Sequence, residues 1–156
     1  MTLQEYIQLG SEEQISSLEQ YQYDLIKQLL NNSQGDYLLA ADQWLSANIS
    51  QTVVFGGEGN KKNIFRDKLF EEIEKFICGC DDGRYDKERE ELGNNADYAK
   101  ETIISVISAA IGAQLGVAGA FVAPAIVLIF QSLGKIVINA WCEAQKVKRV
   151  AEHQPQ

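Results

Sequence analysis

The sequence TIISVISAAIGAQLGVAGAFVAPAIVLIFQSLG, residues 102–134, contains no charged side chain, although the whole chain carries a net charge of −8. Gly112, Gly116, Gly119 and Pro124 lie inside it, and glycine and proline are the residues that most often break or bend helices. The stretch therefore predicts a hydrophobic hairpin, in which two apolar helices are joined by a turn that begins near Gly116. A helix without a polar face is found either in a membrane or at the centre of a folded core.

The first arm of this hairpin is expected to be a helix over about residues 96–115. Its large apolar side chains share one face: Ile104, Ile107, Ile111 and Leu115. A second face carries only small residues: Ser105, Ala109, Gly112 and Gly116. Small side chains let two helix backbones approach closely, so we predict that this second set is a helix-packing face.

The second arm is expected to begin around Pro124, because proline is tolerated in the first turn of a helix, and to continue to about residue 150. Along this single helix, polar residues recur at spacings of three and four and form a polar stripe: Ser132, Lys135, Asn139, Glu143 and Lys146. Apolar side chains follow the opposite side: Ile126, Phe130, Leu133, Val137 and Trp141. The last helix is therefore predicted to be amphipathic from about residue 131 onward.

The rest of the chain predicts amphipathic helices. A capping-box pattern begins at Ser11 and predicts one helix over residues 11–31. Its apolar stripe recurs at helical spacing and consists of Ile15, Leu18, Tyr21 or Gln22, Leu25 and Leu29. Similar patterns predict helices over residues 36–49, 61–77 and 86–92.

We therefore predict an all-α fold, a single domain of five to six helices around an apolar C-terminal helical hairpin. Its parts are the acidic amphipathic helices of residues 1–101, the hairpin and amphipathic last helix of residues 102–150, and a polar tail at residues 151–156.

The charges are unevenly distributed along the chain. All acidic residues except Glu143 and Glu152 precede residue 102, whereas Lys146, Lys148 and Arg149 cluster near the C-terminus. An acidic body argues against nucleic acid as a partner, because phosphate binding needs a basic surface. The basic cluster suits a helix C-terminus, and it also suits contact with anionic lipid or with an acidic patch of the body.

The first residues contain neither a basic segment nor an early apolar run, so no secretory signal is recognised. We expect a cytoplasmic protein, with association to a membrane as the alternative. The three cysteines, Cys78, Cys80 and Cys142, are an odd number and do not predict a disulfide framework, which agrees with a reducing compartment.

No group of residues predicts an enzyme. The glycine-rich stretch at residues 55–62 does not match the spacing of a phosphate-binding loop, and the only histidine, His153, lies in the polar tail. The spacing of Cys78 and Cys80 is unusual for structural zinc, and the Asp81–Asp82 turn lacks the spacing of a calcium loop. We expect no catalytic residue, no metal site and no cofactor.

Two interpretations of the hairpin stay open. Its first arm, residues 102–118, would be about 25 Å long as a helix, which is slightly shorter than the roughly 30 Å hydrocarbon core of a bilayer. Lys135 would be costly inside a membrane unless it reached the surface or lined water. In the other interpretation, the hairpin is the buried core of a helical bundle and the polar stripe faces solvent.

The arrangement is similar to the hydrophobic hairpin that pore-forming toxins such as the colicin pore domain keep at the centre of a helical bundle. The resemblance concerns the hairpin region and is one of pattern, without a shared sequence motif. It implies a small non-enzymatic effector that acts on a membrane, as toxins and defence effectors do. The alternative is an interaction module that forms a homo-oligomer or binds a protein partner, with the hairpin as its core.

Overall fold

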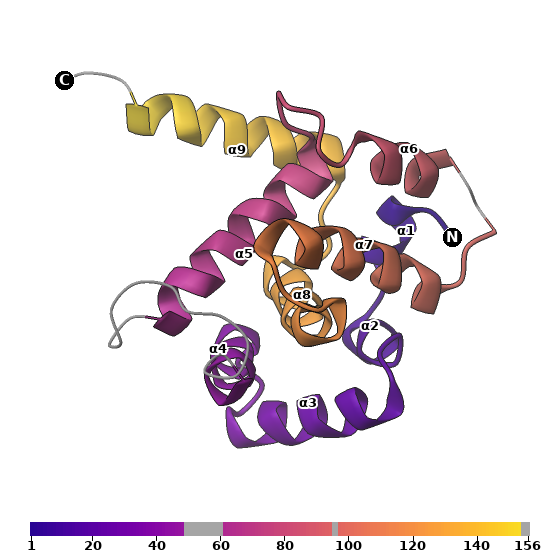
Figure 1. Cartoon of the computed structure of the whole chain (residues 1–156), viewed down its shortest axis with the longest axis vertical. Coiled ribbons are helices and arrows are strands. Elements are labelled where there is room, and N and C mark those ends of the chain that lie inside the picture. The colour runs from indigo at the N-terminus through magenta and orange to yellow at the C-terminus, as the bar shows by residue number, and fades with distance from the viewer. Residues whose placement is uncertain (49–60, 95–96, 154–156) are drawn as a thin grey trace.

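The computed structural model describes residues 1–48, 61–94 and 97–153. All regular structure in these residues is helical and none is strand, so the predicted all-α class is confirmed (Figure 1). The helices are α1 (Leu3–Ile7), α2 (Ser11–Ile15), α3 (Gln20–Asn32), α4 (Tyr37–Asn48), α5 (Lys61–Cys78), α6 (Asp86–Asn94), α7 (Lys100–Leu115), α8 (Gly119–Leu133) and α9 (Ile138–His153).

These nine helices outnumber the predicted five to six because of three local features. α1 was not expected, although Thr2 and Glu5 form a capping box at its start. The single helix predicted over residues 11–31 is divided into α2 and α3, and the predicted last helix is divided into α8 and α9. The glycine-rich stretch at residues 55–60 lies outside the described residues.

The division between α2 and α3 changes which side chains are buried. The chain turns after Ser16, and Glu19 caps α3 in a capping box with Gln22. The side chains that α3 buries are Gln22 and Ile26, whereas Leu25, which an uninterrupted helix would place in the core, is exposed. The prediction of one continuous helix over residues 11–31 is therefore wrong, and its apolar stripe fails at Leu25, whereas Ile15 and Leu18 are buried as predicted.

α8 occupies the centre of the molecule. Every residue from Phe121 to Phe130 is buried. α7 and α4 form its largest contacts and α2 and α5 add smaller ones, so that other helices surround α8 (Figure 1). A helix without a polar face has no side that favours contact with water, which explains its place at the centre of the core.

Three glycines shape the corner between α7 and α8. Gly116 ends α7 in the left-handed conformation with φ of 74°, and the two helix axes differ in direction by 113°. A Cβ atom on Gly112 would lie 2.7 Å from the Val117 carbonyl oxygen, and one on Gly119 would lie 3.2 Å from the Ala109 nitrogen. The backbones of the two arms therefore meet at this corner.

Among the described helices, none is by itself both long and apolar enough to cross a bilayer. α7 and α8 meet that criterion only when they are taken together as a bent pair.

α9 lies at the edge of the molecule, where it packs on α5 and its C-terminal end points away from the bundle (Figure 1). Gly134, with φ of 76°, ends α8, and residues 134–137 connect it to α9. The single last helix predicted to run to residue 150 is therefore wrong. A glycine directly after an apolar helical run is a frequent C-terminal signal, so the sequence does contain a sign of this break.

Candidate functional site

The predicted helix-packing face of α7 is only partly used for packing. Gly112 is buried at the corner, and the backbone of Ala109 lies close to Gly119. Ser105 and Gly116 are exposed, as is the side chain of Ala109. The small residues thus permit the close approach of α7 to the start of α8, but they do not form a continuous buried face.

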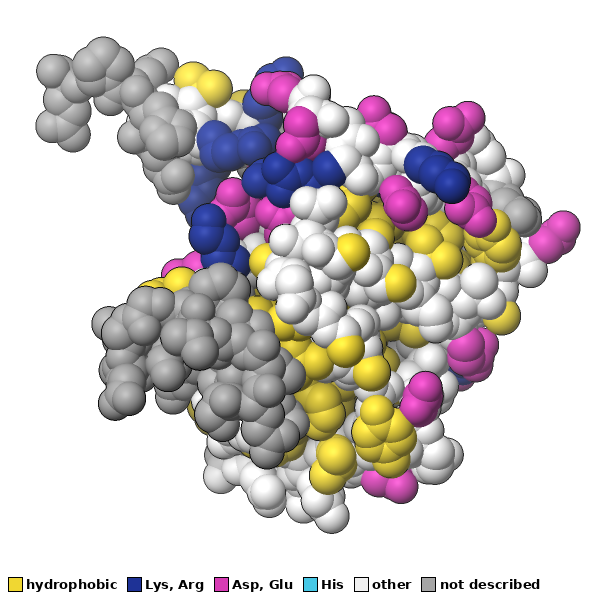
Figure 2. Space-filling view, viewed as in Figure 1, with side chains coloured by type: hydrophobic (Ala, Val, Ile, Leu, Met, Phe, Trp, Pro, Cys, Tyr) yellow, Lys and Arg dark blue, Asp and Glu magenta, His cyan; other side chains and the backbone are white. Residues whose placement is uncertain are grey.

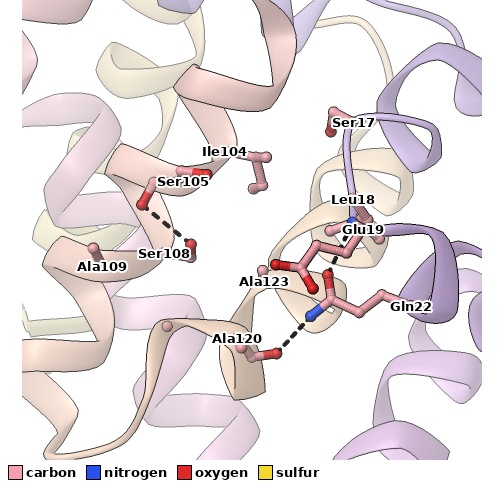
Figure 3. Close-up of a pocket in the computed structure, with 11 residues that line it drawn as sticks. Ser17, Leu18, Glu19, Gln22, Ile104, Ser105, Ser108, Ala109, Ala120 and Ala123 are labelled. Carbon is pink, nitrogen blue, oxygen red and sulfur yellow. Dashed lines mark hydrogen bonds between the residues drawn. The ribbon is translucent and has the colours of Figure 1, made fainter.

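The remainder of this face opens on a pocket of about 240 Å³ (Figure 3). Ser105 and Ser108 line it from α7, Ala120 and Ala123 from α8, and Gln22 from α3. The Ser108 hydroxyl already donates a hydrogen bond to the Ser105 carbonyl oxygen, at 3.3 Å. The part of the lining that α7 and α8 contribute consists mostly of small side chains, whose small volume explains the pocket, while Leu18, Glu19 and Gln22 line its other side.

Pro124 was predicted to lie in the first turn of its helix. In the structure it lies inside α8. A proline within a helix has no N–H, so the carbonyl group four residues earlier, that of Ala120, loses its usual helical partner. The side-chain amide of Gln22 donates to this oxygen at 2.9 Å, and Gln22 is itself buried (Figure 3). Gln22 therefore supplies the hydrogen bond that Pro124 removes.

A second side chain binds the same end of α8. The indole Nε1 of Trp44, in α4, donates to the Phe121 carbonyl oxygen at 2.8 Å. α3 and α4 are thus joined to the beginning of α8 by directed hydrogen bonds as well as by apolar contact.

The other end of α8 is held by residues of α1 and α2. The fully buried amide of Gln14 donates to the Tyr6 carbonyl oxygen at 2.8 Å and accepts a hydrogen bond from Gln131 of α8. Beyond α8, the amide of Gln4 donates to the Ile136 carbonyl oxygen and accepts from the Ile138 N–H, each at 2.9 Å.

Gln8 adds a longer hydrogen bond of 3.3 Å to the Ile136 carbonyl oxygen. Four glutamines thus form hydrogen bonds to α8 or to residues near its ends, and we call them the glutamine clasp: Gln4, Gln8, Gln14 and Gln22. Because amides do not titrate between acid and neutral pH, these contacts keep their donors and acceptors over that range. The clasp was not found from the sequence, because four glutamines among exposed polar residues carry no distinguishing local pattern.

The predicted polar stripe is divided by the break between α8 and α9. Ser132 lies in the last turn of α8 and Lys135 lies in the connection, whereas Asn139, Glu143 and Lys146 belong to α9. All five side chains are exposed to solvent. They therefore do not form one face of one helix in this structure.

A charged cluster fixes the turn between α5 and α6. The carboxylate of Glu72 is buried and accepts hydrogen bonds from the Tyr85 hydroxyl at 2.7 Å and from Arg84 at 3.0 Å. Arg84 also binds Asp82 through Nε at 2.9 Å. Burial raises the pKa of Glu72, but the hydrogen bonds from Tyr85 and Arg84 outweigh it and leave the pKa below its ordinary value.

The cysteines do not all remain thiols, contrary to the sequence analysis. Cys78 at the end of α5 and Cys142 in α9 form a disulfide across 64 positions of the chain. Cys80 is free and donates a hydrogen bond to Asp82. The spacing of the cysteines gave no sign of this pair, because the two residues meet only when α9 packs on α5.

Comparison of the chain with known protein families finds no matching family, and no curated protein or solved structure matches it. The function must therefore be argued from the arrangement of the helices themselves.

Proposed function

We propose that this protein is a non-enzymatic effector that carries the α7–α8 hairpin inside a helical bundle and inserts it into a membrane. The observation that carries the proposal is the continuous burial of α8 from Phe121 to Phe130. Such a helix must be covered in water but needs little cover in lipid, where its backbone hydrogen bonds are satisfied internally except at the Ala120 carbonyl group, which Pro124 leaves without a helical partner. The same helix is therefore suited to both environments.

The lengths of the two arms favour an inserted hairpin over two complete spans. α7 has 16 residues and α8 has 15. At about 1.5 Å per residue, neither reaches the roughly 30 Å thickness of the hydrocarbon core. We propose that both ends of the hairpin stay on one side of the bilayer, which becomes thinner around it.

Insertion requires the bundle to open around α8. The contacts that must break are the glutamine clasp, the Trp44–Phe121 hydrogen bond and the packing of α4 against α8. These contacts are neutral and mostly apolar. An agent that opens the bundle must therefore offer the apolar side chains of α8 another apolar environment. A lipid surface has this property, whereas a change of charge at the clasp does not.

The first experiment mixes the purified full-length protein with liposomes, then measures flotation with the vesicles and release of a trapped dye. The critical variant is Ala113→Asp, because Ala113 is exposed in the bundle but belongs to the arm that would enter lipid. A carboxylate there should leave the fold intact and strongly oppose insertion, at a cost of about 2.5–3.5 kcal/mol near the bilayer centre. The matched control is Ala47→Asp, an exposed alanine of α4.

We expect leakage with the wild-type protein and the Ala47→Asp control, and little leakage with Ala113→Asp. No leakage with any of the three proteins, or equal leakage with all of them, would exclude insertion of the hairpin.

A second variant tests whether the inserted hairpin forms a water-filled pore. Lys135→Leu removes the charged residue that follows α8 in the chain, and a lysine near a membrane is tolerated where it reaches water. Reduced or altered ion conductance would support a pore lined by this residue. Unchanged conductance would exclude that lining role without affecting insertion itself.

A different function is favoured by another surface. Four large apolar side chains of α3 and α4 are exposed: Tyr21, Leu25, Leu38 and Leu39. An interaction module would use such side chains to form a homo-oligomer or to bind a protein partner. In that case Leu25→Ser with Leu39→Ser should shift the molar mass in light scattering toward the monomer, and the wild-type protein should leave vesicles intact.

A further inference from the structure

α9 combines exposed apolar and basic side chains on the side that faces away from the bundle. Among the large hydrophobic residues that the structure describes, the three most exposed are Val147 at 67%, Val137 at 57% and Val150 at 54%. Val147 and Val150 belong to α9, and Val137 immediately precedes it. No other helix described here exposes apolar side chains to this extent.

The inner side of α9 is fixed against α5. Cys142 forms the disulfide with Cys78, Trp141 is half-buried against the core, and Arg149 makes an ion pair with Glu74 at 3.4 Å. These contacts determine the rotation of α9 about its own axis. The side opposite to them is therefore directed outward whenever the fold is intact.

We call that side the α9 outer face, and its exposed residues are Ala140, Glu143, Ala144, Val147, Val150 and Ala151. Successive residues of a helix are rotated by about 100°, so Lys146 and Lys148 lie on opposite flanks of Val147. Both lysines are exposed. A mostly apolar strip with one lysine on each flank is similar to the arrangement of helices that lie flat in the interface of a bilayer, and Glu143 is the acidic residue within this strip.

We propose that the α9 outer face binds the surface of an anionic membrane, and this inference rests on the function proposed for the hairpin. The valines would enter the boundary between headgroups and acyl chains, while Lys146 and Lys148 would extend to the phosphate groups. α9 directly follows α8 in the chain, so its binding brings the hairpin to the lipid surface before the bundle opens.

The distribution of charge favours lipid over a second copy of the chain. Two outer faces packed together would bring Lys146 and Lys148 of both copies close to one another, with only Glu143 on each face to offset them. In the view of Figure 2, basic side chains gather over α9 and the adjoining end of α5 with acidic side chains among them, while further acidic side chains are spread over the right-hand side of the molecule. An anionic membrane would attract the basic edge and repel the acidic body, which orients the protein.

The test measures flotation of the full-length protein with vesicles of phosphatidylcholine alone and of phosphatidylcholine mixed with phosphatidylglycerol, at low and high salt. We expect binding to the anionic vesicles only, with weaker binding as salt increases. Lys146→Glu with Lys148→Glu should lower the affinity at least tenfold, because each basic residue near such a surface contributes about 1 kcal/mol. The matched control is Lys68→Glu with Lys87→Glu, which makes the same charge change at exposed positions of α5 and α6.

The outcomes separate this inference from the function on which it rests. Docking through α9 should persist in Ala113→Asp, the variant expected to stop leakage. If the Lys146–Lys148 reversal binds and leaks like the wild-type protein, the α9 inference is overturned and hairpin insertion stands. If the wild-type protein binds anionic vesicles through α9 but never causes leakage, docking stands and the function proposed for the hairpin fails. A change of molar mass in the reversal variant, without a change in lipid binding, would identify a second copy as the occupant and overturn the inference.

Discussion

α8 and α9 are consecutive helices of 15 and 16 residues, yet their surroundings are opposite. α8 is surrounded by other helices and is held by apolar packing and neutral hydrogen bonds to the glutamine clasp. α9 touches the body along one side, where a disulfide and an ion pair hold it, and it exposes its other side to solvent. The residues of α8 are apolar on every side, whereas α9 also carries exposed charged and polar side chains, so the continuous burial of α8 agrees with the distribution of side chains around it.

The comparison teaches that the two helices would separate from the body in different ways. Removing α9 exposes little apolar surface but must break or stretch a covalent link. Removing α8 breaks no covalent bond, but it exposes the whole apolar core. Four measurements test this contrast, from the largest expected change in the free energy of unfolding to the smallest.

The largest loss in the free energy of unfolding is expected for a substitution in α8. Phe130 is buried, and its ring makes an edge-to-face contact with that of Tyr6 at 6.2 Å. Phe130→Ala should lower the free energy of unfolding by about 3–5 kcal/mol, because it removes buried surface and leaves a cavity. Val147→Ala in α9 should change it by less than about 0.5 kcal/mol. Urea denaturation followed by circular dichroism measures both, and similar values for the two variants would contradict the contrast.

The next effect concerns the disulfide. Cys78→Ser with Cys142→Ser should lower the free energy of unfolding by about 2–4 kcal/mol, because the unfolded chain is no longer constrained across this long loop. Cys80→Ser is the control and should have little effect. A reducing agent should shift the urea midpoint of the wild-type protein to that of the double variant, and an unchanged midpoint would show that the bond does not stabilise the fold.

A smaller effect is expected for the clasp. Gln22→Leu should cost about 1–3 kcal/mol of stability, because the buried Ala120 carbonyl group loses its partner. Gln28→Leu, at an exposed position of the same helix, is the control. The sharper measurement repeats Gln22→Leu in a Pro124→Ala background, where the restored N–H of residue 124 can bind the Ala120 oxygen. The cost of Gln22→Leu should then fall, and an unchanged cost would show that Gln22 does not compensate for Pro124.

The smallest expected effect is a dependence of the free energy of unfolding on pH through Glu72. The pKa of Glu72 is lower in the folded than in the unfolded protein, so its ionised form stabilises the fold above its ordinary pKa of 4.5. This stabilisation is lost as the pH falls below 4.5 and through the lower folded value. Glu72→Gln should therefore cost about 1 kcal/mol at pH 7 and less under acidic conditions, as measured by urea denaturation at several pH values. A difference that does not shrink on acidification would contradict this account.

Much of the local structure could be predicted from the sequence, and less of the candidate site. The hairpin turn is recognisable because Gly116 and Gly119 interrupt an otherwise apolar stretch. The division between α2 and α3 was missed because Leu25 continues a helical repeat that the folded chain does not use. The Gln22–Ala120 contact could not be predicted, because a glutamine has no pattern that identifies a partner 98 positions away.

The sequence by itself determined that the chain is helical, that residues 102–134 are apolar and uncharged and that small residues interrupt them. These properties depend on helix propensity and on the spacing of side chains within a few turns. Only the tertiary structure decided which helices surround α8, which glutamines hold its ends and which cysteines pair. These contacts join residues far apart in the chain, and their energies depend on burial, which exists only after the helices have packed.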